Sequence, residues 1–330
     1  MINMRIRVTP ILLLIDLAIV ASMLASASTI YAGSLGPHLI DSLPFRIQQR
    51  GTYRLALDLT YASPKGAAIS VMANEVTLDL NGKTLFGSAG PSTGAVGISA
   101  LDRQGITIKN GRVSGFYFGI DIQATDRDTR KSKKHNLVDV RLERNWYFGV
   151  RLVGSRSVIR DCVISDTGGS TRKQHTIPHG VRFVGENNVM RDNRICDLRL
   201  RHFPYGKGEI VAVHFDRAKN SVLDNNLIIE LNRETDDPIP PDDKRERRFG
   251  VWVNGGPSHD TFLHVRDNVF RGFTVPLAFT PGTDGRVKDN VFYNADVAPI
   301  RGKPASQLAD NIIQKSRVPP SEARTHPTSK

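Results

Sequence analysis

Five residues that can bind or transform an anionic ligand recur at one position of a repeated short segment. Asp121, Arg151, Arg182, His214 and Trp252 each stand third in the segments GIDI, GVRL, GVRF, AVHF and GVWV. Arginine can hold a carboxylate through two parallel hydrogen bonds, and histidine can exchange protons near neutral pH. Tryptophan offers a flat apolar face for stacking. The pattern indicates a site for an anionic ligand, with a candidate base inside it.

These segments are predicted to be short strands on which apolar side chains point inward. Side chains alternate between the two faces of a strand, so the residues on either side of the outward position face the core. Those residues are apolar in every copy: Ile98, Ile120, Val150, Val181, Val213, Val251 and Leu277, then Ala100, Ile122, Leu152, Phe183, Phe215, Val253 and Phe279. If the strands stack in parallel at about 4.8 Å, the five polar or aromatic residues form one line on the surface.

A second repeated motif, Asp-Asn-x-Ile and its variants, fixes the period of this stack. Its first position is filled by Asp161, Asp192, Asn225, Asp267, Asp289 and Asp310, and the last three of these follow one another at intervals of 22 and 21 residues. A repeat of this length is typical of a solenoid. We expect the asparagines Asn193, Asn226, Asn268, Asn290 and Asn311 to form a hydrogen-bonded ladder at one corner, where asparagine also tolerates left-handed backbone geometry.

The stretches VTLDLNGKTLFG (76–87) and GITIKNGRVSGF (105–116) resemble the opening coils of right-handed parallel β-helix proteins of the pectate-lyase type. The resemblance implies an all-β fold, a right-handed single-stranded parallel β-helix over residues 71–313. Residues 33–70 would then cap the solenoid, and residues 314–330, rich in Pro, Ser and charge, would form a disordered tail. Cys162 and Cys196 would lie one coil and three residues apart, too far for a disulfide.

Residues 1–32 have the pattern of a secretory signal peptide, with Arg5 and Arg7 before the apolar run 11–24 and small residues after it. The expected location is therefore secreted or periplasmic, without stable membrane insertion after cleavage. A retained membrane anchor is the alternative, although the run is short for a spanning helix. Nucleic acid fits poorly as a partner of an exported chain, despite the net charge of +12.

Insertions interrupt the repeat and carry much of the positive charge. They are Thr125–His135, Asp166–His179, Arg199–Glu209 and Asn232–Arg248, and they include His175, His202 and Tyr205. Insertions at one corner of a solenoid project on one side and are usually the binding face. The alternative is that they are simply solvated loops. Together with the outward row, they suit an acidic polysaccharide, such as a polymer of uronic acids.

Uronic-acid lyases and C5-epimerases share a first step, the removal of the proton beside the carboxylate, which needs a cation and a base. Arg182 and Arg151 are candidates to neutralise the carboxylate, His179 or His214 to act as the base, and Tyr205 to act as the acid. Further substrate contacts are expected from Asp121, Trp252, His175, His202, Asp216 and Asn254. Pro178-His179 resembles the core of the Asp-Pro-His-Asp motif of alginate C5-epimerases of β-helix fold, but both acids are missing here.

Other assignments remain open. A glycoside hydrolase would need two facing carboxylates, for which Glu209, Asp216, Asp236 and Asp237 are available, but the motifs of polygalacturonase-like hydrolases are absent. Arg151 and Arg182 could instead pair with Asp121 or Glu143, which would leave a non-catalytic carbohydrate-binding or surface protein. One acid in the row disfavours calcium, so no metal or cofactor is expected. The sequence does not indicate an oligomeric state.

Overall fold

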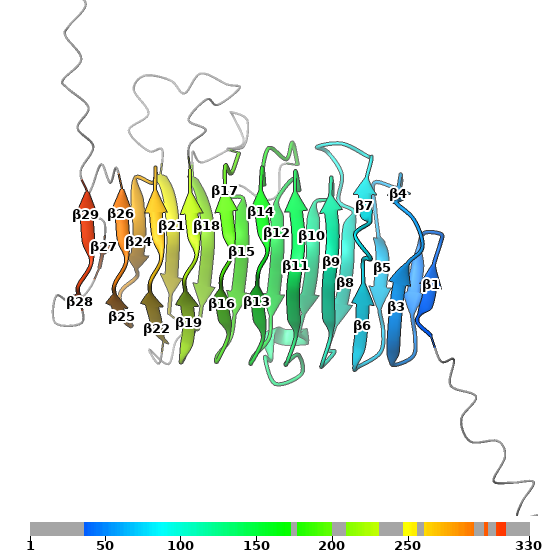
Figure 1. Ribbon diagram of the computed structural model, residues 1–330, viewed down its shortest axis with the longest axis horizontal. Coiled ribbons are helices and arrows are strands. Elements are labelled where there is room, and N and C mark those ends of the chain that lie inside the picture. Colours follow the sequence, from blue (N-terminus) through cyan, green and yellow to red (C-terminus); the bar gives the residue numbers. More distant parts are fainter. Residues whose placement is uncertain are drawn as a thin grey trace, which may run out of the picture. The chain divides into compact units, whose positions relative to one another are not determined.

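The computed structural model describes residues 36–172, 177–199, 209–230, 247–255, 261–293, 300–302 and 308–314. The chain divides into two units, Met1–Pro37 and His38–Lys330, and the second contains almost all of the described residues (Figure 1). The expected signal peptide lies outside the described residues, as does the expected tail apart from Gln314. No helix in the described ranges is long and apolar enough to cross a membrane.

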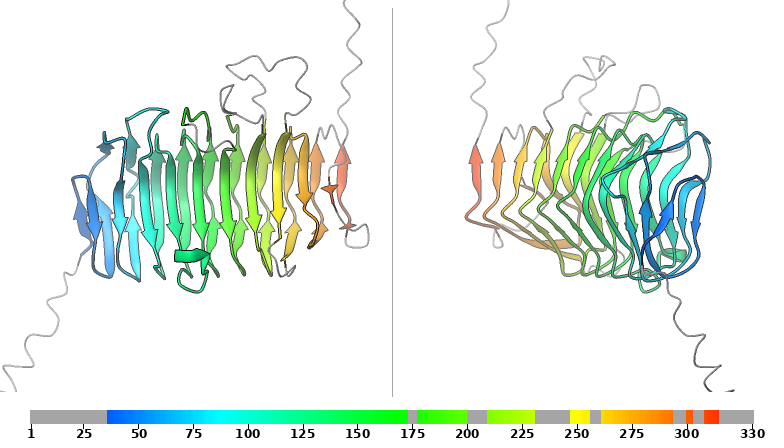
Figure 2. Two further views of the ribbon diagram at one scale, coloured as in Figure 1. Left: turned by 180° about the vertical axis from the view of Figure 1, so that it is seen from behind. Right: turned by 45° about the vertical axis from the view of Figure 1, so that its right-hand side comes forward.

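The described strands form two parallel sheets, of 19 and 10 strands, which we call sheet A and sheet B. Along the chain, one strand or two consecutive strands of sheet A are followed by one strand of sheet B, and this order repeats from β1 to β27 (Figures 1 and 2). The strands of sheet A are β1 (His38–Ile40), β3 (Gly51–Leu55), β4 (Leu59–Tyr61), β6 (Val76–Asp79), β7 (Thr84–Gly87), β9 (Thr107–Ser114), β11 (Asn136–Glu143), β13 (Val158–Arg160), β14 (Val163–Ser165), β16 (Val189–Arg191), β17 (Arg194–Cys196), β19 (Ser221–Asp224), β20 (Leu227–Ile229), β22 (Thr261–Arg266), β23 (Val269–Arg271), β25 (Thr283–Lys288), β26 (Val291–Tyr293), β28 (Leu308–Ala309) and β29 (Ile312–Gln314).

Sheet B carries the segments with the outward row. Its strands are β2 (Phe45–Ile47), β5 (Ala67–Val71), β8 (Val96–Leu101), β10 (Phe118–Gln123), β12 (Phe148–Val153), β15 (His179–Val184), β18 (Glu209–Asp216), β21 (Arg247–Asn254), β24 (Val275–Phe279) and β27 (Ile300–Arg301). One short 3-10 helix, η1 (Thr125–Arg127), follows β10. The right-handed, single-stranded parallel β-helix predicted from the sequence is therefore the fold of this chain.

The core consists of the apolar rows expected from the repeat. Ile98, Val150 and Val251 are fully buried, and every other residue of the two inward rows is at most 6% exposed. The glycine that opens each segment also faces the core. A Cβ atom on Gly119 would lie 2.7 Å from the Gly149 carbonyl oxygen and 3.0 Å from Leu142, so a larger residue would not fit.

The asparagine ladder is confirmed. The side chain of Asn193 donates to Asn226 Oδ1 at 2.9 Å, Asn226 donates to Asn268 Oδ1 at 2.9 Å, and Asn268 donates to Asn290 Oδ1 at 3.0 Å. Each Oδ1 also accepts the backbone N–H of the preceding asparagine, at 2.9–3.0 Å. The ladder satisfies polar groups inside the stack, where an unpaired group would be costly.

The residue that takes left-handed geometry is not the asparagine, which corrects the expectation. The residue before it does so in every copy, with φ between 50° and 58° at Asp161, Asp192, Asn225, Asp267, Asp289 and Asp310. Aspartate, like asparagine, tolerates this region because its short polar side chain bonds locally. The motif therefore assigns separate tasks to its two residues: the Asp turns the backbone and the Asn side chain bonds between coils.

The strands begin N-terminal to residue 71. β1 pairs with β3, and β2 pairs with β5, so residues expected to form a separate cap contribute strands to both sheets. Cys162 and Cys196 are buried free thiols. Ser165 is the partner of Cys196 on the neighbouring strand, which confirms the expected separation of one coil and three residues.

Candidate functional site

The five residues of the outward row lie on consecutive strands of sheet B. The strand register pairs Asp121 with Arg151, Arg151 with Arg182, Arg182 with His214, and His214 with Trp252. Two residues further along β18 and β21, Asp216 and Asn254 form a second outward pair in register. With His179 at the start of β15, the register thus brings eight chemistry-bearing residues to one face.

Arg151 is not free to bind a ligand, because Asp121 holds it. Its Nε and a terminal nitrogen donate to the two carboxylate oxygens at 2.7 and 2.8 Å. The guanidinium also lies 4.1 Å from the centre of the Phe118 ring. The Asp121 side chain is 8% exposed and that of Arg151 24%. The alternative of an internal Asp121–Arg151 pair is therefore correct for this arginine, which forms a neutral unit in the row.

Arg182 is held more loosely and keeps hydrogen-bonding capacity. One terminal nitrogen donates to Asp216 Oδ2 at 3.2 Å, so its carboxylate partner is neither Asp121 nor Glu143. Its Nε is buried and has no hydrogen-bond partner. A buried donor without an acceptor is costly, and an incoming carboxylate could supply that acceptor.

His179 and His214 form a hydrogen-bonded chain whose direction can be derived. His179 Nδ1 lies 2.9 Å from the Ile177 carbonyl oxygen, which can only accept, so Nδ1 carries the proton. Nε2 of the neutral ring is then an acceptor, and it lies 3.2 Å from His214 Nδ1, which must donate. His214 Nε2 therefore carries a lone pair, and this buried atom has no hydrogen-bond partner. The hydrogen-bonded pair of histidines therefore has one ring nitrogen with an unshared lone pair, His214 Nε2.

Both imidazoles are neutral at pH 7. Burial lowers the pKa of His214 to about 3, and the positive charge of Arg182 acts in the same direction. Burial also lowers the pKa of His179 well below its ordinary value, with further contributions from His214 and Arg182. A neutral imidazole is the form that accepts a proton, so the charge state suits a base.

Trp252 packs within the row instead of offering an open platform. Its ring stacks on His214, with centroids 5.3 Å apart and planes 13° apart, and the Phe249 ring lies 5.1 Å away. The Asn254 side chain accepts a hydrogen bond from Thr280 Oγ1 at 3.2 Å. These contacts hold the C-terminal end of the row in place.

An aromatic row that the sequence reasoning missed lies beside the polar one. Phe118, Phe148, His179, Val211 and Phe249 are in register on successive strands. The rings of Phe148 and His179 lie 4.7 Å apart. A signal was available in the sequence, since each of these residues directly precedes the first residue of the repeated segment, which is usually glycine. The row forms an apolar wall that excludes water from one side of the histidines.

A pocket of about 550 Å³ continues the polar row toward the N-terminus. Its lining includes Arg46, Ser70 and Ser99, which precede Asp121 in the same register. The small side chains of Ser70 and Ser99 leave the space, and exposed Met72 and Leu101 border it. The volume lies within the range of small-molecule sites.

The insertions are placed at two corners. Those that follow β14, β17 and β20 interrupt the chain before the N-terminal ends of β15, β18 and β21, of which β15 begins at His179. The insertion Thr125–His135 follows β10 and so lies at the opposite edge of sheet B, where Figure 1 shows η1; it does not extend the same face. His175, His202 and Tyr205 fall outside the described residues, so the structure does not place them.

The described start of the first insertion folds back along the solenoid. Thr171 N–H donates to the Pro91 carbonyl oxygen at 3.1 Å, and the Arg172 guanidinium lies 5.3 Å from the centre of the Tyr117 ring. The ends of the longest insertion are joined by a buried ion pair between Glu230 and Arg248, at 3.2 Å. Over the described part of the chain, no group of three or more side chains of the metal-binding kinds is found.

Comparison with known proteins supports the fold. No family model matches the chain, and no curated protein sequence matches it. Among solved structures, the enzymatically active domain of tailspike protein 2 of bacteriophage CBA120 aligns with a TM-score of 0.50 and 12% identity, over 77% of this chain and 38% of that one. The Dettilon tailspike protein aligns with a TM-score of 0.40 and 11% identity, over 83% and 60% of the two chains. Pectate lyase Pel9A gives a TM-score of 0.41 and 11% identity, over 82% and 68%. The present chain thus spans 38% and 60% of the two tailspike chains, less than two thirds of each.

Proposed function

We propose that this chain is an exported, carbohydrate-active β-helix protein that acts on a uronic-acid polymer by removing the proton beside the carboxylate. One observation carries the proposal: Arg182 and His214 stand on adjacent strands, and each has a buried nitrogen without a hydrogen-bond partner. A carboxylate would satisfy the first, and a carbon acid would approach the second. The similar solved structures support only the fold, not the reaction.

In this mechanism the Arg182 guanidinium binds the sugar carboxylate, and His214 Nε2 takes the proton from the neighbouring carbon. The electron pair of the broken C–H bond moves onto the carboxylate, where Arg182 stabilises the developing charge. A lyase then breaks the bond to the leaving glycosidic oxygen and forms a double bond. An epimerase returns a proton to the opposite face of the same carbon. Tyr205 remains the proposed acid for either outcome.

His214 is the better candidate base of the two histidines. Both ring nitrogens of His179 are engaged, whereas His214 has a free lone pair. His179 then acts as a positioning residue that sets the tautomer of His214. Burial is the larger cause of the lowered pKa of His214 and the charge of Arg182 the smaller one, so a carboxylate bound to Arg182 offsets only the second cause.

Binding without catalysis is the second candidate. The bidentate Asp121–Arg151 pair and the 6% exposure of His214 favour it, since both restrict access to the row. A glycoside hydrolase is less well supported, because Asp121 and Asp216 are each hydrogen-bonded to a guanidinium group, whereas a proton-donating carboxylic acid needs an environment that favours its neutral form.

The test uses the purified protein with polygalacturonate, alginate and glucuronan. We expect ultraviolet absorbance from new double bonds with one polymer for a lyase, or altered polymer NMR without absorbance for an epimerase. His214→Gln should reduce turnover at least ~100-fold, the scale of general base catalysis. Arg182→Ala should weaken binding and turnover together; because it leaves the Asp216 carboxylate, whose side chain is 11% exposed, without its ion-pair partner, the melting temperature of the variant is measured alongside.

His264→Ala is the matched control, since His264 lies in β22 of sheet A, and it should retain full turnover. Binding of one polymer without chemical change would replace the enzymatic proposal with the binding candidate. If Arg182→Ala unfolds the protein while the affinity for polymer persists, the row is structural and the proposal fails.

A further inference from the structure

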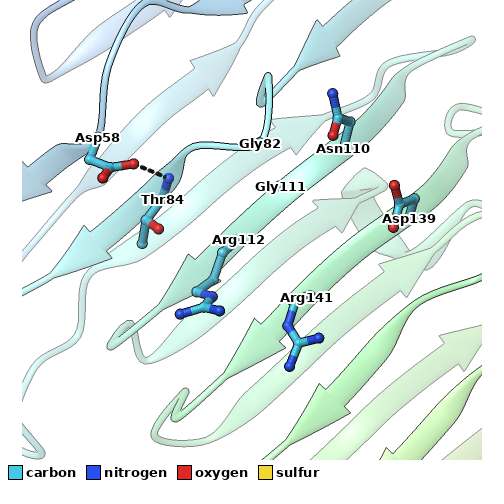
Figure 3. Close-up of a pocket in the computed structure, with 8 residues that line it drawn as sticks. All are labelled: Asp58, Gly82, Thr84, Asn110, Gly111, Arg112, Asp139 and Arg141. Carbon is cyan, nitrogen blue, oxygen red and sulfur yellow. Dashed lines mark hydrogen bonds between the residues drawn. The ribbon is translucent and has the colours of Figure 1, made fainter.

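A second pocket lies on sheet A, away from the row of sheet B. It has a volume of about 350 Å³, and its lining includes Asp58, Thr84, Asn110, Arg112, Asp139 and Arg141 (Figure 3). Thr84, Arg112 and Arg141 are in register on β7, β9 and β11, and their side chains face outward. This pocket shares no residue with the site proposed above.

The pocket coincides with an interruption of the repeat. Gly111 and Val140 occupy the positions that Cys162 and Asn193 take in the following coils, so the asparagine ladder does not extend here. β9 and β11 pass through the corner as unbroken strands. A Cβ atom on Gly111 would lie 2.4 Å from Leu80 Cβ, so the glycine is required where the turn at residues 80–83 packs against β9. The regular corner is replaced by a hollow.

The polar groups around the hollow carry charges of both signs. Arg112 and Arg141 both contact Glu143, at 3.3 and 2.7 Å, but their side chains are 46% and 52% exposed. Asp58 Oδ1 accepts the Thr84 backbone N–H at 2.7 Å, as Figure 3 shows, and Asp139 supplies another carboxylate. With Glu143, the carboxylates outnumber the guanidinium groups, which disfavours an anionic ligand. Donors beside acceptors suit adjacent hydroxyl groups, each of which donates one hydrogen bond and accepts another.

Two exposed apolar side chains lie near lining residues in the sequence, although they are not part of the lining itself. Phe86 is 42% exposed and follows Thr84 by two residues on the same face of β7, and Leu57, which directly precedes Asp58, is 48% exposed. A sugar ring has polar edges and an apolar face, and aromatic side chains pack against such a face. We propose that this pocket binds one uncharged sugar residue of a saccharide, independently of the row on sheet B.

The test measures binding of cellohexaose, maltohexaose and laminarihexaose by isothermal titration, with hexagalacturonate for comparison. We expect at least one neutral hexasaccharide to bind. Asp139→Asn, Arg141→Ala and Phe86→Ala should each weaken that binding at least ~10-fold, while Arg182→Ala leaves it unchanged. Asp139→Asn is the conservative variant, because asparagine tolerates the left-handed backbone of this position, where φ is 53°.

Arg194→Ala is the matched control, since Arg194 occupies the same outward row as Arg141 two strands further on and lies outside the pocket. It should bind like the unmodified chain. The proposal is overturned if no neutral hexasaccharide binds, if the pocket variants bind normally, or if Arg182→Ala removes the binding. These results do not depend on whether the sheet B row acts on uronic acids.

Discussion

At the scale of single residues, Arg182 acts in two ways, on its neighbour His214 and on an incoming ligand. Its charge helps to keep the imidazole neutral, and its Nε–H, which has no hydrogen-bond partner, offers a donor to an anion. The sequence predicted that these residues share one face, because alternation along a strand decides which side chains point outward. It offered pairing of the two arginines with Asp121 or Glu143 only as an alternative. It did not predict that Asp216 would contact Arg182, since the pairing depends on side-chain geometry across strands.

The buried histidines predict that the protein loses stability as the pH falls below neutral. The pKa of His214 is lowered to about 3 and that of His135 to about 4, both by burial, whereas an unfolded histidine titrates near 6.5. Below about pH 6.5 the unfolded chain binds protons that the folded chain does not, so the free energy of unfolding falls with pH down to the folded pKa values. Each such histidine contributes a slope of up to about 1.4 kcal/mol per pH unit.

Urea unfolding at several pH values between 7 and 4.5 measures this slope. His214→Gln should reduce it, because glutamine cannot titrate, and His264→Gln should reduce it less, since His264 is more exposed. An equal slope in the His214→Gln variant and the unmodified chain would show that His214 does not titrate differently in the two states.

At the scale of strands and corners, the repeat predicted which residues form the core but not how each corner is built. Because the outward row takes the third position of each segment, strict alternation predicts that the opening glycine faces outward and that the residue before it faces the core. Instead the glycine and the next residue both face the core, as the Cβ contacts of Gly149 and Gly180 with Ile164 and Ile195 show. This break in alternation turns Phe118 and Phe148 outward. The aromatic wall therefore depends on a local backbone bend that periodicity does not reveal.

Asn268→Val should destabilise the protein by several kcal/mol. Asn268 is fully buried, and its side chain donates to the carbonyls of Leu223 and Arg266 and to Asn290 while accepting from Asn226. Valine of similar size makes none of these bonds, and each buried group left without a partner costs about 1–3 kcal/mol. Thermal and urea unfolding measure the loss.

Asn311→Val is the matched control at the last rung, where the asparagine is only half-buried and has no following asparagine to bond. It should cost less than Asn268→Val. Equal costs would mean that the ladder contributes no more at its centre than at its end. Neither variant should alter ligand affinity, because Asn268 and Asn311 lie in later coils than the residues that line either pocket.

At the scale of the whole unit from residue 38 onward, stability comes from stacking each coil on its neighbours. The sequence predicted this stack from the period of the Asp-Asn motif, and it predicted that the later insertions share one corner, because they interrupt the repeat at the same point. The insertion Thr125–His135, which the sequence placed at a related corner, interrupts the repeat one strand later and so lies at the other edge of sheet B. A difference of one strand in the insertion point exchanges the two edges.

The two ends of the stack should exchange their amide hydrogens at different rates. At the N-terminal end, Ile40 and Ile47 are fully buried, whereas at the C-terminal end Leu308 and Ile313, which continue the inward rows, are 37% and 51% exposed. In a solenoid each coil is stabilised by its neighbours, so a terminal coil with an open core opens most easily. Hydrogen exchange followed by mass spectrometry should show the strongest protection in β12, β15 and β18, less in β1 to β3, and at least ~100-fold faster exchange in β28 and β29. Uniform protection along the chain would show that the coils open together and that exposure of the last inward residues has no local effect.

Ile313→Asp should then separate the two models further: it should abolish the remaining protection of β29 without changing that of β15, because few contacts connect a terminal coil to coils beyond its neighbour.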